Sequence, residues 1–166
     1  MDELKQSRHR PPLPLDRPRQ LVIALPPMRS HVDVSRIARA AGCFGVRRII
    51  ACGNAKLDPK IAREATTQVK LELRRSLLPV LKTLRDEAYS LVGLEQANGS
   101  VPVYEFAFPR KTALIIGNER LGIESNILSE LNHIVEIPTH GLPYSHNAAT
   151  AAAIAMYEYC RQYPLG

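Results

Sequence analysis

Short apolar runs alternate along the chain with amphipathic segments, and this alternation limits the possible folds more than any other feature of the sequence. The runs have the length and β-branched content of buried strands, and the segments between them place apolar residues at helical spacing. The expected strands span residues 21–26, 46–52, 69–74, 89–96, 112–117 and 134–138, and the expected helices span 33–41, 58–65, 77–84 and 147–162. Strands alternating with helices predict the α/β class, with a mostly parallel sheet and helices on both faces.

The first 19 residues differ in composition from the rest of the chain. They are polar, basic and rich in proline, which removes backbone donors, and they offer little apolar surface for burial. We therefore expect an extended N-terminal arm at 1–19 and one domain at 20–166, a length that suits a single core. Two interpretations of the arm stay open: it grips the phosphates of a polyanionic partner, or it is a solvated tail.

The overall charge favours a polyanionic partner. The formal net charge is +6, and a protein that neutralises phosphates releases condensed counterions. No apolar run approaches the roughly 20 residues of a bilayer span, and the N-terminus lacks the apolar core of a secretory signal. Cys43, Cys52 and Cys160 show no paired spacing, which predicts free thiols rather than a metal site or disulfides. We expect a cytoplasmic protein without a metal or a membrane partner.

Common nucleotide and hydrolase motifs are missing from the sequence. No GxGxxG follows the first expected strand, and no Walker A, GxSxG, HxH or HExxH pattern is present. Ligands of parallel α/β sheets bind beyond the carboxyl ends of strands. Three of those ends, at residues 94–96, 117–119 and 137–138, are rich in groups suited to a polar ligand.

Three blocks of sequence remain as carriers of chemistry. They are DVSRIARAAGCFGV at 33–46, ALIIGNERLG at 113–122 and IPTHGLPYSHNAATAAA at 137–153. In order and spacing they resemble the three motifs of the SpoU/TrmH branch of the SPOUT RNA methyltransferases. The likeness covers roughly residues 20–162, and the three motifs in order are far more specific than any one of them alone.

The resemblance implies a fold that periodicity does not reach. In this family the C-terminal segment threads through a loop to form a deep trefoil knot, one of the rarest chain topologies. The resemblance also implies that S-adenosyl-L-methionine binds bent inside the knot, and that two chains form a homodimer with the active site between them. The implied reaction is methyl transfer to a ribose 2′-oxygen of tRNA or rRNA. The alanines after Asn147 fit a dimer that packs through the last helix.

Four residues match the family's catalytic positions. Arg39 matches the catalytic arginine, and because arginine stays protonated, its expected role is to orient a phosphate or the hydroxyl and to stabilise developing negative charge. Glu119 would hold Arg39 or the ribose, or would instead cap the helix near residue 124. Ser145 and Asn147 would lie near the cofactor and the ribose, and capping of the last helix is their alternative or additional role.

The resemblance assigns cofactor binding to groups near the expected strand ends. The segment 94–96 resembles the family's cofactor loop, and Gly117 would let the cofactor approach the backbone closely. Ile137 and His146 would offer backbone groups to the adenine and methionine parts, whereas Gly122 serves a turn. The expected cofactor-binding residues are Leu94, Glu95, Gln96, Gly117, Ile137, Ser145 and His146.

The chain departs from the family pattern at several positions. The family usually has asparagine where Asp33 stands, and an ionised aspartate cannot donate the hydrogen bond that an asparagine amide can. Asp33 is also a possible N-cap of the first helix. Leucine is usual at His146, serine at Ala149 and small residues at 35–36. A rival interpretation is therefore a catalytically silent RNA-binding dimer that retains the fold. Base methylation by a related SPOUT branch fits the motif residues less well.

Overall fold

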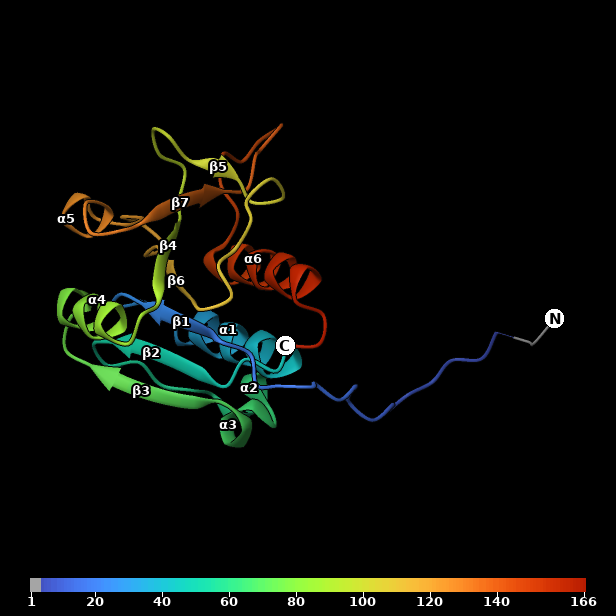
Figure 1. Ribbon diagram of the computed structural model, residues 1–166. Coiled ribbons are helices and arrows are strands. Elements are labelled where there is room, and N and C mark those ends of the chain that lie inside the picture. The colour runs from blue at the N-terminus through green and yellow to red at the C-terminus, as the bar shows by residue number, and fades with distance from the viewer. Residues whose placement is uncertain (1–3) are drawn as a thin grey trace.

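The computed structural model describes residues 4–166, which form one seven-stranded sheet flanked by helices (Figure 1). The strands are β1 (Leu21–Leu25), β2 (Arg48–Cys52), β3 (Lys70–Arg74), β4 (Ser90–Leu94), β5 (Val101–Pro102), β6 (Thr112–Ile116) and β7 (His133–Glu136). The helices are α1 (His31–Cys43), α2 (Pro59–Ala62), α3 (Ala65–Gln68), α4 (Leu77–Asp86), α5 (Ser125–Leu128) and α6 (Ala148–Gln162). The strand order is β3-β2-β1-β6-β4-β7-β5, with every neighbouring pair parallel, so the predicted α/β class is confirmed.

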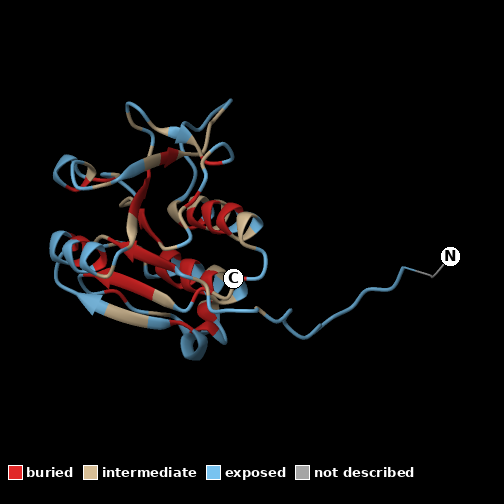
Figure 2. Ribbon diagram, in the orientation of Figure 1, coloured by how far each residue is buried: buried red, intermediate tan, exposed pale blue. Residues whose placement is uncertain are grey.

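Helices cover both faces of the sheet because successive strand residues point to opposite sides. In β1, Leu21, Ile23 and Leu25 belong to one core with α1 and α6, whereas Val22 and Ala24 belong to a second core with α4 and α5. All five residues of β1 and of β6 are buried, and β2 and β4 are buried after their first residue (Figure 2). This two-sided burial explains why the central strands are continuous apolar runs in the sequence rather than alternating patterns.

The start of α1 and the helix expected at 58–65 differ from the sequence-based expectations. The N-cap of α1 is Ser30, whose hydroxyl accepts the backbone N–H of Asp33 at 3.1 Å, so the assignment of Asp33 as N-cap was wrong. The expected helix at 58–65 is two short helices, because Arg63 adopts a left-handed backbone with φ of +56° and ends α2. Asp58 caps α2 by accepting the backbone N–H of Lys60.

Two short elements were missed, and β1, β4, β6 and β7 end one or two residues earlier than predicted. β5 has two residues and α5 has four, which is too short for a periodic pattern to show in the sequence. β7 ends at Glu136 rather than at residue 138. Pro138 lacks the backbone N–H that a longer strand would need for pairing.

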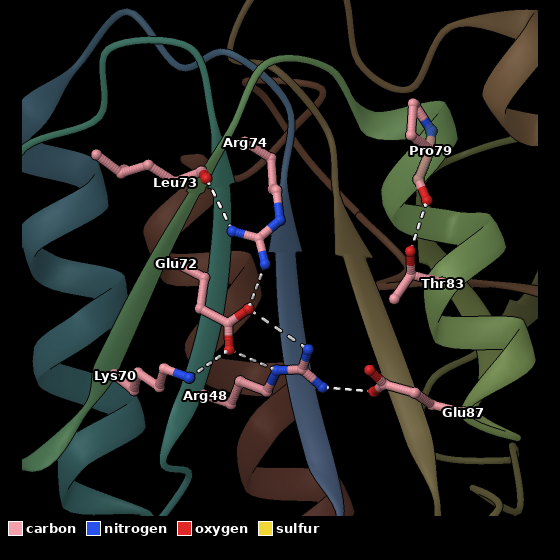
Figure 3. Close-up of polar contacts among 8 residues, drawn as sticks. All are labelled: Arg48, Lys70, Glu72, Leu73, Arg74, Pro79, Thr83 and Glu87. Atoms are coloured by element: carbon pink, nitrogen blue, oxygen red, sulfur yellow. Dashed lines mark hydrogen bonds and ion pairs between the residues drawn. The ribbon is translucent and has the colours of Figure 1, made fainter.

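The edge strand β3 is joined to the rest of the sheet by an ion-pair network around Glu72 (Figure 3). The Glu72 carboxylate lies 2.9 Å from Arg48 of β2, 2.9 Å from Arg74 and 3.3 Å from Lys70, and Arg48 also contacts Glu87 at 2.6 Å. Burial raises the pKa of Glu72, but its hydrogen bonds to Arg48 and Lys70 and the charges of these residues outweigh burial and hold the pKa below its ordinary value. The network ties together two strands and the C-terminal end of α4.

The N-terminal arm has two parts in the described range. Residues 4–14 are exposed and extend away from the domain in Figure 1, and residues 1–3 of the predicted arm lie outside the described range. Closer to the domain, Arg19 donates hydrogen bonds to the backbone carbonyls of Phe44 and Tyr163, and the Asp16 N–H donates to Leu165. The last residues of the arm therefore hold the C-terminal segment against the loop after α1.

None of the helices within residues 4–166 has the length and apolar character that crossing a membrane requires. The deep trefoil knot stays a prediction.

Candidate active site

A cavity of about 770 Å³ opens at the carboxyl ends of the parallel strands. Its walls come from stretches that lie far apart in the sequence. They are 94–96 after β4, 116–123 after β6, 136–137 at the end of β7 and 145–148 before α6, together with Asp33, Leu128 and Ala151. The carboxyl ends of parallel strands meet at one edge of a sheet, which is why these separate stretches share one cavity.

Glu95 fixes the loop that forms one wall of this cavity. Its Oε2 accepts the backbone N–H of Ile123 at 2.8 Å, and its Oε1 accepts that of Gln96 at 2.9 Å. The carboxylate packs so closely that a Cβ on Gly122 would lie 2.3 Å from Oε2, and one on Gly117 would lie 3.2 Å from the same atom. Gly122 has φ of +64°, as its expected turn requires. Glu95 therefore shapes the cavity as well as lining it.

Asn118 joins the same loop to the end of β1. Its Nδ2 donates to the backbone carbonyl of Pro27 at 2.8 Å, and its Oδ1 accepts the backbone N–H groups of Arg120 at 2.9 Å and Leu121 at 3.2 Å. One amide thus closes the turn and anchors it to a neighbouring strand. Sequence reasoning did not assign Asn118 a role, although its place directly after Gly117 at a strand end was a usable signal.

Glu119 holds the segment that leads into α1. Its carboxylate accepts the backbone N–H groups of Arg29 at 3.3 Å and Ser30 at 3.1 Å. The alternative that Glu119 caps the helix near residue 124 was wrong, because the N–H groups that it binds precede a different helix. Within the described residues Glu119 makes no ion pair with Arg39.

Asn147 connects the third sequence block to the first. Its Oδ1 accepts the backbone N–H groups of Ala149 at 2.9 Å and Thr150 at 3.2 Å, so Asn147 is the N-cap of α6. Its Nδ2 donates to Asp33 Oδ2 at 3.1 Å. Asp33 is only 6% exposed and lies 3.7 Å from Arg36. Because an ionised carboxylate only accepts hydrogen bonds, Asp33 fixes the direction in which the Asn147 amide points.

The segment between β7 and α6 contributes several residues to the cavity wall. Gln96 Nε2 donates to the backbone carbonyl of Tyr144 at 3.3 Å, and the Thr139 hydroxyl donates to the same carbonyl at 3.4 Å. Ser145 and His146 follow directly, and both are exposed while lining the cavity. The polar edge of the cavity is therefore held by side chains from two different strand ends.

Arg39 lies apart from the other predicted catalytic residues. It belongs to an exposed stripe of α1 that also contains Val32, Arg36 and Cys43, and it does not line the cavity. It makes no hydrogen bond or ion pair with another residue of the range 4–166. Its guanidinium is available to a group outside the single chain.

The charged residues of the cavity wall are mainly acidic. Asp33, Glu95, Glu119 and Glu136 line it, and Arg120 is the one arginine or lysine among the described lining residues. Within residues 4–166 the side chain of Glu136 has no hydrogen-bond or ion-pair partner, whereas the other three carboxylates bind protein groups. The wall favours a ligand that carries positive charge.

The structure brings together all but one of the residues that the sequence singled out. The predicted residues that line the cavity are Leu94, Glu95, Gln96, Gly117, Glu119, Ile137, Ser145, His146 and Asn147. Arg39 is the exception. The apolar part of the wall, formed by Ile116, Ile123 and Ala151, was not predicted, because buried apolar residues beside a ligand resemble ordinary core residues in a sequence.

The model of the SpoU rRNA Methylase family matches residues 20–157. The chain belongs to this family. Among curated relatives, the tRNA (guanosine(18)-2'-O)-methyltransferase TARBP1 of Mus musculus is 38% identical over 97 residues, which cover 58% of this chain and 6% of the relative. The 23S rRNA (uridine(2479)-2'-O)-methyltransferase of Streptomyces viridochromogenes is 30% identical over 140 residues, which cover 78% of this chain and 48% of that one. This SpoU-family chain thus spans only part of these relatives.

Solved structures of the family share the fold. The A. aeolicus TrmH/SpoU tRNA modifying enzyme has a TM-score of 0.84 at 23% identity, with 90% of this chain and 78% of that one covered. The SpoU methyltransferase AviRb from Streptomyces viridochromogenes, solved in complex with the cofactor AdoMet, has a TM-score of 0.76 at 30% identity, with 90% and 63% covered.

Proposed function

We propose that the chain is an S-adenosyl-L-methionine-dependent RNA methyltransferase that transfers a methyl group to a ribose 2′-oxygen of tRNA or rRNA. The observation that carries this proposal is the convergence of the second and third sequence blocks, with Asp33 of the first, on one cavity at the carboxyl ends of the sheet. The named activities of the two curated relatives support it, since both methylate a 2′-oxygen of RNA.

The cavity fits S-adenosyl-L-methionine in size and in charge. Its volume of about 770 Å³ lies within the range of small-molecule sites. The cofactor carries a sulfonium and an ammonium group, which suit an acidic wall, and the Glu136 carboxylate has no hydrogen-bond or ion-pair partner within residues 4–166. Ile116 and Ile123 offer apolar surface to the adenine, and the backbone at Ile137 and His146 offers hydrogen-bonding groups. The family member AviRb was solved with this cofactor.

When bound, the cofactor would supply the methyl group, and this chain's residues would position the acceptor. A ribose hydroxyl is a poor nucleophile because its proton must leave as the oxygen attacks the methyl. Arg39 would hold the RNA phosphate or the hydroxyl and stabilise the developing negative charge. Ser145 and Asn147 would orient the ribose at the mouth of the cavity, with the Asn147 amide held by Asp33. Glu119 would act as a positioning residue through its hold on the start of α1.

We infer that the active form is a homodimer in which Arg39 acts on the cavity of the other copy. In one chain Arg39 is exposed and outside the cavity. α1 packs on α6, and α6 carries its own outward stripe of Thr150, Ile154, Tyr157 and Arg161, in which Tyr157 is 62% exposed. A second copy that covers α1 and α6 would bury Tyr157 and bring its own Arg39 toward the mouth of the first copy's cavity.

The rival function is a silent RNA-binding dimer. The observation that favours it is Asp33, whose carboxylate ties up the Asn147 amide within the cavity wall. A direct test measures cofactor binding by calorimetry and then transfer of a labelled methyl group to bulk tRNA and rRNA. Transfer that appears as 2′-O-methylated nucleosides supports the enzyme. Binding without transfer to either RNA supports the rival and contradicts the proposal.

Arg39→Ala tests the assigned catalytic arginine. We expect transfer to fall by at least a hundredfold, while cofactor affinity stays within about tenfold, or roughly 1.4 kcal/mol. Arg47→Ala is the matched control, because Arg47 is exposed, follows the same helix and does not line the cavity. Equal losses of cofactor affinity and transfer in the Arg39 variant would show that the residue is structural.

A further inference from the structure

A second cavity, of about 310 Å³, lies on the other side of the loop that Glu95 holds. The two cavities share the wall residues Ile116, Asn118, Leu121, Gly122 and Ile123. The remaining walls of the second cavity are residues 26–27 after β1, the start of α4 at 76–78, and Glu124, Asn126 and Ile127. A ligand in the second cavity would therefore lie one loop away from a cofactor in the first.

The walls of the second cavity combine apolar surface with a few polar groups. Pro26, Pro27 and Leu78 supply apolar faces that are not fully buried. Ser76 is the N-cap of α4, yet its hydroxyl makes no capping hydrogen bond. Among residues 4–166 the Asn126 side chain likewise has no hydrogen-bond partner. An apolar slot with a few uncommitted donors and acceptors is the usual character of a small-molecule site.

Three arginines stand next to, or within two residues of, wall residues of this cavity in the sequence. Arg29 follows the β1 wall by two residues, Arg75 directly precedes Ser76, and Arg120 precedes Leu121 in the shared loop. All three arginines are exposed. A polyanion bound near this cavity would find cations on three of the segments that form or adjoin its walls.

We propose that the second cavity receives an unstacked nucleobase of the substrate RNA, at or beside the nucleotide that is methylated. This inference rests on the proposed function, since it names what the same enzyme uses to recognise its substrate. Proteins read RNA sequence mainly on unpaired bases that leave the stack and lie against side chains, and enzymes that act on nucleotides hold extruded bases between apolar side chains. The arginines contact the flanking phosphates, and Ser76 and Asn126 hydrogen-bond to the edge of the base.

Glu124 favours guanine among the four bases. It lines the second cavity, and within the described residues its carboxylate has no hydrogen-bond or ion-pair partner. Guanine presents N1–H and the N2 amino group side by side on its Watson–Crick edge, and a carboxylate accepts both. Adenine, cytosine and uracil present no such pair of adjacent donors.

The test fills the cavity without touching the cofactor site. Leu78→Trp adds bulk from α4, and Asn126→Trp adds it from α5; neither residue lines the first cavity. Leu73→Trp is the control, because Leu73 is also an exposed leucine, 53% accessible, and lines neither cavity. Cofactor affinity is measured by calorimetry, folding by thermal unfolding, and kcat and KM by methyl transfer to RNA that the wild type modifies.

We expect both cavity-filling variants to bind the cofactor within twofold of the wild type and to lose at least tenfold in kcat/KM, with a raised KM for RNA. Leu73→Trp should keep the cofactor affinity and the kcat/KM of the wild type. If the two variants fold, bind cofactor and methylate RNA like the control, the nucleobase proposal is overturned while the proposed function stands. If the wild type binds the cofactor and modifies no RNA, the proposed function itself fails.

Glu124→Gln tests the guanine assignment with short RNAs that differ only in the base of the modified nucleotide or its neighbours. We expect the wild type to prefer guanine at one of these positions, and the variant to lose at least fivefold of that preference while its thermal unfolding is unchanged. A preference for guanine that survives the substitution contradicts the role of Glu124. A wild type that prefers no base contradicts base recognition in this cavity.

Discussion

The two edges of the sheet differ sharply in charge. Residues 29–75, which form α1 to α3 with β2 and β3, contain eleven lysines and arginines and four acidic residues, a net charge of +7. Residues 86–136, which form β4 to β7, contain three basic and eight acidic residues, a net charge of −5. The net charge of the whole chain conceals this division.

The division matches the two ligands of the proposed reaction. The acidic region supplies most of the first cavity, where a cationic cofactor would bind, whereas the basic region supplies Arg39 and most of the cations suited to an RNA backbone. Carboxylates beside a phosphate chain would repel it, so separating the two charges lets one small domain bind both partners. The following predictions test the expected role of each region, from the largest effect to the smallest.

The largest effect is expected in the acidic region from Gly122→Ala. A Cβ at this position would lie 2.3 Å from Glu95 Oε2, so the carboxylate must move and the cavity wall with it. We expect cofactor affinity to fall by about a hundredfold, roughly 2.7 kcal/mol, measured by calorimetry. Gly99→Ala is the matched control, because Gly99 also has a positive φ, +80°, but nothing lies within 4 Å of its Cβ position. An equal loss in both variants would mean that backbone strain, not crowding, causes the effect.

A smaller effect is expected in the basic region from Lys56→Gln combined with Lys60→Gln. Both lysines are exposed, and we expect them to contact RNA phosphates. Removing two such contacts should lower RNA affinity by about tenfold at low salt and reduce the slope of log affinity against log salt by about 1.5. A filter-binding titration at several salt concentrations measures both values. The control variant combines Lys82→Gln with Lys111→Gln, because both lysines lie outside residues 29–75. Its salt slope should equal that of the wild type. If RNA affinity and salt slope fall as much in the control, the two regions do not differ in RNA binding.

The smallest effect is expected from Glu72→Gln, which breaks the ion-pair network that joins β3 to β2. We expect the free energy of unfolding at pH 7 to fall by about 1 kcal/mol, since the partners are partly exposed. The lowered pKa of Glu72 means that its stabilisation is present above the ordinary glutamate pKa and is lost as the pH falls through the folded-state value. The difference between variant and wild type should therefore close in acid, as denaturant unfolding at several pH values would measure.

Glu64→Gln is the control for that experiment, because Glu64 is exposed and its side chain has no ion-pair partner among the described residues. Its unfolding free energy should follow the wild type at every pH. A constant difference between Glu72→Gln and the wild type down to strongly acidic pH would show that packing, rather than charge, is what the substitution removes.

Much of the fold was predictable from local sequence. The central strands are buried on both faces, so their apolar runs were recognisable, and the N-cap of α6 at Asn147 followed from a residue type that suits caps. The elements that were missed, β5 and α5, owe their conformation to neighbours rather than to a pattern of their own. Ser30 and Arg63 set helix boundaries through a single hydroxyl and a single backbone angle, which periodicity does not register.

In the candidate site, too, some features were predictable from the sequence and others were not. Residue types at strand ends pointed to the cavity, because chain direction alone places the carboxyl ends of parallel strands together. The partners of those residues were not predictable: Glu119 binds backbone N–H groups about 90 residues earlier in the chain, and Asp33 binds an amide 114 residues later. Such contacts depend on how loops of different strands meet in space.

The sequence by itself determined the class of the fold, the family and the identity of the residues at the strand ends, because these follow from local pattern and motif order. Only the tertiary structure decided that Glu95 builds the cavity wall as well as lining it, that Arg39 stands outside the cavity of its own chain, and that a second cavity lies beside the first. Hydrogen-bond partners and cavities arise where distant segments pack, and a linear pattern records the segments without the distances between them.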